Sequence, residues 1–156
     1  MSLTGIQRMI KTRGVIAVLL VLTTIPVFQA QADESKPDLT VSMRPHLSST
    51  VHGGEKIGSG QITHQGAHVG FQVWLEGVTS GGGAPERYVL RGRNNPGHEL
   101  RVLIGQDGWI PDSKDGRGII KQTGEPQASF DIIIDGEQVI EADEYSMTVY
   151  GVYLEP

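Results

Sequence analysis

The stretch from Val69 to Glu76, VGFQVWLE, carries the clearest structural pattern in this chain. Its apolar residues stand at every second position: Val69, Phe71, Val73 and Leu75. Because successive side chains of a β-strand point to opposite faces, this alternation predicts a strand with one buried face. The Gly81-Gly82-Gly83 run that follows predicts a flexible loop.

Similar alternation, interrupted by turn signals, recurs on both sides of this stretch. It predicts strands at 39–43, 87–91, 99–104, 130–134 and 145–154, with a weaker, glycine-broken candidate at 57–63. Asn94-Asn95-Pro96-Gly97 predicts a turn, and the glycine-rich stretch 105–124 predicts mostly loop around Trp109. Helical periodicity is nowhere sustained, so the expected fold class is all-β, an antiparallel sandwich of about six or seven short strands.

The last predicted strand has an unusual composition. Tyr145, Met147 and Val149 alternate with polar residues, whereas the segment from Val149 to Leu154 is apolar on both faces. A strand of this kind needs cover on both faces and a neighbour at its edge. The residues alone leave two explanations open: a central strand covered by the chain's own elements, or a strand that pairs with another molecule.

The first 32 residues have the organisation of a secretory signal peptide. Arg8, Lys11 and Arg13 form a positive segment, an apolar run extends from Gly14 to Phe28, and Ala30-Gln31-Ala32 offers a small-residue cleavage site. The apolar run is shorter than the roughly 20 residues that span a bilayer, which disfavours a transmembrane anchor. We therefore expect residues 1–32 to be removed on export and residues 33–156 to form one domain.

The composition excludes several classes of function. The chain carries 13 Lys and Arg against 18 Asp and Glu, and an acidic surface argues against binding to nucleic acid or to anionic membranes. Cysteine is absent, which excludes an internal disulfide, a thiol nucleophile and a cysteine-based metal site.

The histidines do not predict a metal site. His64 and His68 are four residues apart, and on a strand this spacing would separate them by about 13 Å. His46, His52 and His98 are scattered through turns and loops. We therefore expect surface histidines and no bound metal.

No arrangement of residues predicts catalysis or a cofactor. Asp107-Gly108 and Asp115-Gly116 lack the spaced oxygen ligands of a calcium loop. Gly58-Ser59-Gly60 lacks the strand-to-helix frame of a serine nucleophile. Trp74 and Trp109 are expected to pack in the core or at its rim. The expectation is a binding protein and not an enzyme.

Six segments of the chain, taken in order, resemble the AfaD invasin-like minor subunits of Afa/Dr and aggregative-adherence fimbriae. They are Gly70-Phe71-Gln72-Val73-Trp74, Glu86-Arg87-Tyr88-Val89, Gly97-His98-Glu99-Leu100-Arg101-Val102, Asp107-Gly108-Trp109-Ile110-Pro111, Phe130-Asp131-Ile132 and Glu144-Tyr145. Their order and approximate spacing agree from about Leu39 to Leu154. Fimbriae of this type are assembled by the chaperone–usher route in Gram-negative bacteria.

The resemblance implies an immunoglobulin-like sandwich that lacks its last strand. A neighbouring subunit, or the periplasmic chaperone before it, would supply that strand by donor-strand complementation. The groove that receives the strand is expected along the first and last predicted strands, at Leu39, Val41, Met43, Tyr145, Met147, Val149, Gly151 and Tyr153. The resemblance thus favours pairing with another molecule as the explanation of the last strand.

The resemblance also implies one departure from the family. Its members usually carry a cysteine pair that joins the strand before Gly-Phe-x-Val-Trp to the last strand. In this chain His64 and Tyr153 occupy the matching positions, so we expect these two side chains to be neighbours without a covalent link.

The function expected from the resemblance is adhesion to, or invasion of, host cells by a minor subunit at the fimbrial tip on the cell surface. Its partners would be the chaperone, the outer-membrane usher, a neighbouring subunit and a host cell-surface receptor, with the integrin class among the candidates. A structural cap or assembly initiator without a receptor is the alternative, and a free periplasmic binding module is a third reading. The segment 33–38 is charged and contains a proline, so we expect the subunit to accept a strand and to donate none, unless 39–43 is itself the donor.

Overall fold

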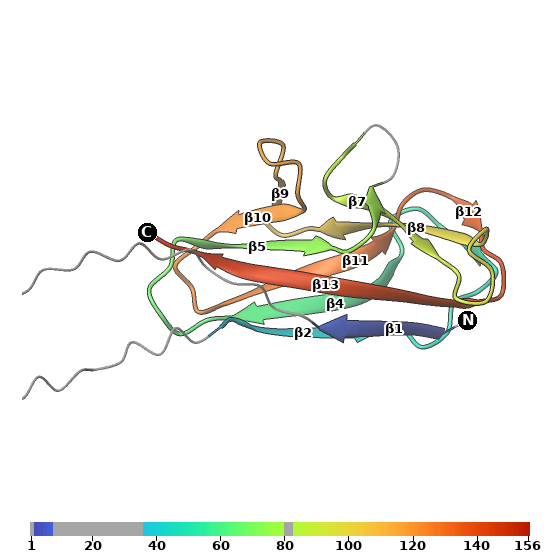
Figure 1. Ribbon diagram of the computed structural model, residues 1–156, viewed down its shortest axis with the longest axis horizontal. Coiled ribbons are helices and arrows are strands. Elements are labelled where there is room, and N and C mark those ends of the chain that lie inside the picture. Colours follow the sequence, from blue (N-terminus) through green and yellow to red (C-terminus); the bar gives the residue numbers. More distant parts are fainter. Residues whose placement is uncertain (1, 8–35, 80–82) are drawn as a thin grey trace, which may run out of the picture.

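The structure is a computed structural model that describes residues 2–7, 36–79 and 83–156 (Figure 1). The apolar run and the cleavage site of the predicted signal peptide lie outside the described residues. Within the described residues, every regular element is a β-strand, and none of them holds a helix long and apolar enough to cross a membrane. The predicted all-β fold class is confirmed.

The described strands form two main sheets and one short ribbon. The first sheet has the order β1 (Ser2–Gln7), β13 (Glu144–Leu154), β5 (Gly70–Leu75), β10 (Ile119–Gln122) and β9 (Ile110–Pro111). The second has the order β2 (Asp38–Met43), β4 (Lys56–Thr63), β11 (Gln127–Ile134), β8 (Glu99–Gly105), β7 (Arg87–Arg91) and β6 (Val78–Thr79). The ribbon pairs β3 (Thr50–Val51) with β12 (Gln138–Val139).

The two main sheets share one hydrophobic core. Phe71 and Val73 of the first sheet and Phe130 and Ile132 of the second are at most 1% exposed, and they belong to the same buried cluster. Alternate residues of β5, β7 and the first half of β13 belong to this cluster, as the sequence pattern predicts. Val69 is an exception because it precedes β5 and its side chain is 46% exposed.

One pairing differs in direction from all the others that are described. β1 pairs with β13 in parallel, from Ser2 opposite Glu144 to Gln7 opposite Val149, whereas the remaining ladders are antiparallel. β1 also lies beside β2 of the second sheet (Figure 1). The first and second sheets therefore approach each other at the edge that β1 occupies.

Most of the predicted strands are present at the expected places. β5, β7, β8, β11 and β13 agree with the prediction to within about three residues at each end, and the Asn94-Asn95-Pro96-Gly97 turn joins β7 to β8.

The expectation that 105–124 is mostly loop was incomplete. Ile119–Gln122 forms β10, a strand inside the first sheet that pairs antiparallel with β5 and with β9. Its first residue, Ile119, is 1% exposed. Four residues between glycine-rich segments are too few for the alternation to stand out in the sequence.

The glycine-broken candidate at 57–63 is an interior strand of the second sheet, β4, which pairs with both β2 and β11. Gly60 lies directly opposite Phe130, and a Cβ atom added to Gly60 would lie 2.1 Å from the Phe130 ring. The glycine therefore leaves the space that the aromatic ring fills. A register shift between Ile132 and Ile133 breaks the two-residue period in this strand.

Candidate functional site

β13 is the strand on which the candidate site is built. Tyr145, Met147 and Val149 point into the core and are at most 3% exposed, and Gly151 is buried on the same side. The hydroxyl of Tyr145 donates a hydrogen bond of 2.9 Å to the carbonyl of Glu141. Burial raises the pKa of Tyr145, and the charges of Asp143 and Glu141 add to that effect.

β2 supplies the facing residues from the second sheet. Leu39 is 1% exposed, and Val41 and Met43 are partly buried against the core. A Cβ atom added to Gly151 would lie 2.8 Å from the Ile62 side chain and 3.5 Å from that of Leu39. Leu39 and Ile62, which are cross-strand neighbours in the second sheet, thus both face Gly151 of the first sheet.

The backbone of β1 occupies the position between β13 and β2, which we call the β1 position. Its pairing with β13 covers Glu144 to Val149, and the other edge of β13 pairs with β5 from Val149 to Leu154. The β1 position is therefore a place where one six-residue strand completes the edge of the first sheet. The predicted groove residues Tyr145, Met147 and Val149 lie along it.

Tyr153 lies on the same strand beyond the end of the β1 pairing. Its ring stacks on that of His64, with the ring centroids 3.9 Å apart and the planes at 4°. His64 follows β4 directly and is 7% exposed, so the expectation of surface histidines was wrong for this residue. The expectation that these two residues are neighbours is confirmed, and their contact links the end of the second-sheet strand β4 to the first-sheet strand β13.

The expected separation of His64 and His68 was wrong. Their ring centroids are 5.6 Å apart and the rings meet edge to face. The chain between them turns and does not continue as a strand, because Nδ1 of His68 lies 2.7 Å from the carbonyl oxygen of Gly66 and Nε2 lies 2.8 Å from that of Glu125. Among the described residues, no group of three side chains could hold a metal ion.

A buried carboxylate fixes the start of β13. Asp143 is 6% exposed and accepts hydrogen bonds from the backbone N–H groups of Asn94, Asn95 and Glu144, at 2.7 to 3.0 Å. Nδ1 of His98 lies 2.9 Å from the same carboxylate. The hydrogen bonds, led by that from the Asn94 N–H, hold the pKa of Asp143 well below its usual range, although burial opposes them.

Sequence reasoning missed the anchoring role of Asp143. The turn at 94–97 was recognised from its own residues, but the acceptor of its N–H groups lies 45 or more positions further along the chain. Ile62 was also missed as part of the site. The available signal was its place two residues after Gly60, on the same face of the strand, in the glycine-broken candidate 57–63.

The outer face of β13 and β5 carries a ladder of flat side chains. Trp74 stacks on Tyr150, with ring centroids 5.7 Å apart, and the guanidinium of Arg117 lies 4.9 Å from the Trp74 ring. Trp109 is in the core at 8% exposure, where its Nε1 donates to the carbonyl of Ser129 at 2.6 Å. Both tryptophans therefore pack against other residues of the chain, as expected.

Comparison with known proteins finds a matching family and several relatives of this chain. The family model described as the enterobacterial AfaD invasin protein matches residues 47–151. Protein AfaD of Escherichia coli is 36% identical over 120 residues, which are 76% of this chain and 80% of that protein. Protein AggB of Escherichia coli is 34% identical over 115 residues, which are 73% of this chain and 78% of that protein.

Solved structures agree with these relatives. The Salmonella SafD adhesin superposes with a TM-score of 0.74 at 30% identity, over 78% of this chain and 86% of that chain. The Escherichia coli Hda pilus minor tip subunit, HdaB, superposes with a TM-score of 0.73 at 28% identity, over 78% of this chain and 85% of that chain. The similarity to these subunits confirms the immunoglobulin-like character of the sandwich.

Proposed function

This chain belongs to the AfaD family of enterobacterial invasin proteins, and we propose that it is a minor subunit at the tip of a surface fimbria, held there by a β-strand that a neighbouring subunit donates. The similarity to an adhesin and to a pilus minor tip subunit supports this role. The function is binding, and it needs no catalytic group and no cofactor.

The β1 position is the observation that carries the proposal. The strand found there is Ser2–Gln7, which lies inside the predicted signal peptide. Cleavage after Ala32 would remove that strand and leave the edge of β13 from Glu144 to Val149 without its partner. An unpaired strand edge above buried apolar residues is a template for an added strand, and a partner's strand can supply the missing backbone hydrogen bonds.

The same position explains which partners the mature subunit needs. In the periplasm the chaperone would fill the β1 position and protect the edge from aggregation, and at the outer-membrane usher a neighbouring subunit would replace it. A donor strand with apolar residues at alternate positions suits the inward-pointing Tyr145, Met147 and Val149. The assembled subunit would then lie at the cell surface.

The subunit accepts a strand and donates none. The alternative donor segment, 39–43, lies within β2, which pairs with β4 along its whole length, and Leu39 is 1% exposed. This segment is part of the domain's own sheet, so releasing it would open the core. Ahead of it, residues 33–37 include the charged Asp33, Glu34 and Lys36, which do not suit an apolar site.

Cysteine crosslinking tests the strand-accepting role, because the chain has no cysteine of its own. Ser146 is exposed on β13 and lies opposite Thr4 of β1. We expect Ser146→Cys to form a disulfide with a cysteine placed at an outward position of the donor strand. Gln122→Cys, exposed on β10, is the matched control and should stay reduced. Equal crosslinking at both positions, or none at Ser146, would contradict the proposal.

We further propose that the subunit acts on host cells. The family description as an invasin supports adhesion to or uptake by host cells, through a surface receptor for which the integrin class is a candidate by family resemblance. Purified subunit with its donor strand in place should bind cultured epithelial cells saturably. Absence of saturable binding would favour the alternative, a structural cap or assembly initiator.

A further inference from the structure

The segment 64–69 joins β4 to β5 at the end of the domain where β13 also ends (Figure 1). Its backbone is hydrogen-bonded to two neighbouring elements. The N–H of His64 donates to the carbonyl of Pro126 at 2.8 Å, and the N–H of Val69 donates to that of Leu154 at 2.8 Å. The segment therefore connects the turn between β10 and β11 to the last residue of β13.

The imidazole of His68 adds a side-chain link to this junction. Its Nδ1 lies 2.7 Å from the carbonyl oxygen of Gly66, and its Nε2 lies 2.8 Å from that of Glu125. A carbonyl oxygen can only accept a hydrogen bond, and a neutral imidazole carries a single N–H. The neutral ring can therefore bond to one of the two carbonyls, whereas the protonated ring bonds to both at once.

Loss of one ring proton would place a nitrogen lone pair against a carbonyl oxygen at 2.7 or 2.8 Å. Two acceptors at this distance repel each other, so the ring or one of the carbonyls would move away. Hydrogen bonds from a charged donor are also stronger than those from a neutral one. The link between the 64–69 segment and the β10–β11 turn is thus strongest when His68 is protonated.

The groups around His68 come from each element that packs near it. His64 of the same segment meets the ring edge to face with the centroids 5.6 Å apart, and the Phe71 ring of β5 lies at 4.7 Å. The ionisable side chains of the adjoining elements are Asp38 at the start of β2, Lys121 of β10, Glu125 of the β10–β11 turn, and Tyr153 and Glu155 at the end of β13. The one ammonium in this set bonds to the carbonyl of Asp107 at 2.7 Å, and the three carboxylates are exposed. The charge of the set is negative overall, so it does not oppose a positive charge on His68.

The 64–69 segment also contacts the strand that carries the candidate site. The ring of His64 stacks on that of Tyr153, in addition to the backbone bond to the last residue of β13. We propose that His68 is a proton-operated clamp: the protonated ring ties the 64–69 segment to the β10–β11 turn and so holds the end of β13, and loss of the proton loosens this hold. The clamp acts whether a donor strand or Ser2–Gln7 fills the β1 position.

The sign of the pH dependence follows from the hydrogen bonds of the ring. The protonated form gains a bond in the folded protein that the neutral form lacks. Its stabilising contribution is therefore fully present below about pH 6.5, where unfolded histidine side chains are protonated, and is lost as the pH rises above that value. A comparison of about pH 5.5 with about pH 8 spans this change.

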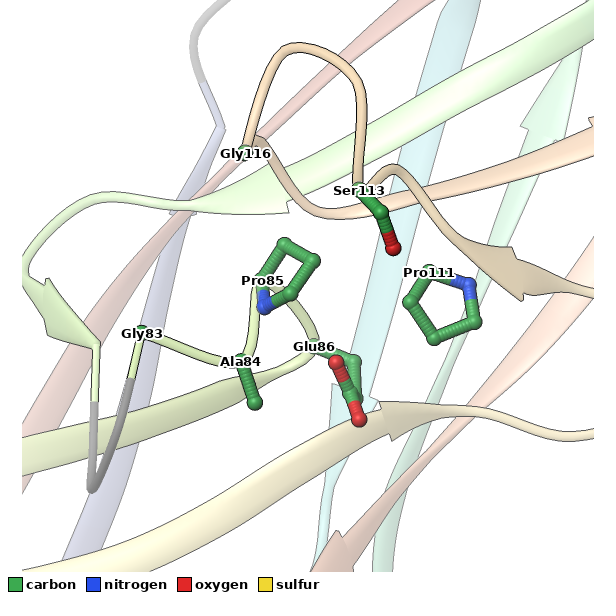
Figure 2. Close-up of a pocket in the computed structure, with 7 residues that line it drawn as sticks. All are labelled: Gly83, Ala84, Pro85, Glu86, Pro111, Ser113 and Gly116. Carbon is green, nitrogen blue, oxygen red and sulfur yellow. The ribbon is translucent and has the colours of Figure 1, made fainter.

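Hydrogen exchange and NMR of the ¹⁵N-labelled protein with a filled β1 position test the clamp. At the lower of the two pH values, His68 should show a second ring N–H signal. The protection factors of the N–H of Val69 and of that of Thr123, which donates to the carbonyl of Val69 at 3.0 Å, should rise about tenfold. The N–H of Arg87 is the reference and should keep its protection, because it donates to the carbonyl of Ala84 in the wall of a pocket that no histidine lines (Figure 2).

Two variants separate the clamp from other effects of pH. His68→Gln removes the ring that donates in two directions and should abolish the rise in protection, whereas His46→Gln, at an exposed site, should keep it. The ring N–H signals are read in the parent protein, so they decide the matter if His68→Gln fails to fold. A single ring N–H signal of His68 at both pH values, an equal rise in His68→Gln, which would assign the effect to His64, or a rise of the same size at Arg87 would overturn the proposal.

Discussion

Asp143 shows how one residue positions the strand that carries the proposed function. Its carboxylate accepts from N–H groups of both the 94–97 turn and β13, so it fixes the start of β13 relative to the β7–β8 hairpin. Because these bonds favour the ionised form, the pKa of Asp143 lies below that of an exposed aspartate. Folding and ionisation of this group are therefore linked.

We predict that Asp143→Asn lowers stability at neutral pH and reduces its loss in acid. The pKa of Asp143 is depressed in the folded state, so its stabilising contribution is fully present above the unfolded value of about 3.9 and is lost as the pH falls below it. Urea unfolding between pH 7 and pH 2 measures the free energy of unfolding of the parent protein and the variant. Asp115→Asn, at an exposed site, is the control and should keep the acid dependence of the parent protein; an unchanged dependence in Asp143→Asn would contradict the account.

His64 and Tyr153 provide a second prediction at this scale. Their rings are stacked at 3.9 Å, and we expect their Cβ atoms to be close enough for a disulfide. His64→Cys with Tyr153→Cys should oxidise in the periplasm and raise stability by about 2–4 kcal/mol, since it would close a long loop. His68→Cys with Tyr153→Cys is the control, and we expect this pair to form no disulfide. A double variant that stays reduced in air would show that the Cβ atoms of positions 64 and 153 are not placed for a disulfide.

β4 illustrates an element whose sequence hides its role. Its glycines at 58 and 60 weaken the strand pattern, yet they leave the space that Met43 and Phe130 occupy. An aromatic ring over a cross-strand glycine is a known way to stabilise a strand that contains glycine. The glycines are thus part of the packing between β2, β4 and β11.

We predict that Gly60→Ala destabilises the domain by about 1–3 kcal/mol, because its Cβ would collide with the Phe130 ring. Phe130→Leu in the same chain should recover part of the loss, since it vacates the space that the Cβ needs. Ser59→Ala, the next position on the opposite face, is the control and should change stability by less than about 0.5 kcal/mol. Urea unfolding curves decide the matter, and equal stability of Gly60→Ala and the parent would contradict the packing argument.

The elements that the sequence predicted well are those whose burial alternates without interruption. β5 and the first half of β13 have one buried face, and alternation alone identifies them. β10 was missed because Ile119 and Ile120 are adjacent and glycines precede them. The contacts of Asp143 and His68 join segments that are distant in the sequence, and residue patterns do not encode such contacts.

At the scale of the whole molecule, the two sheets have two different edges. At one edge β1 pairs with β13 and contacts β2, and at the other edge the sheets end in loops. β1 closes the side of β13 and β2, and the loops around Glu86 and Pro111 line the far side. In the proposed mature subunit the side of β13 and β2 accepts a donor strand.

The melting temperature of residues 33–156, with and without a donor strand fused after Pro156 through a short polar linker, tests the central claim most directly. A filled β1 position buries apolar side chains and pairs the edge of β13, so we predict a soluble monomer whose melting temperature rises by more than about 10 °C. A fused strand with polar residues at the inward positions should give no such rise. Equal melting temperatures for the fused and unfused chains would show that the fold is already complete without a partner.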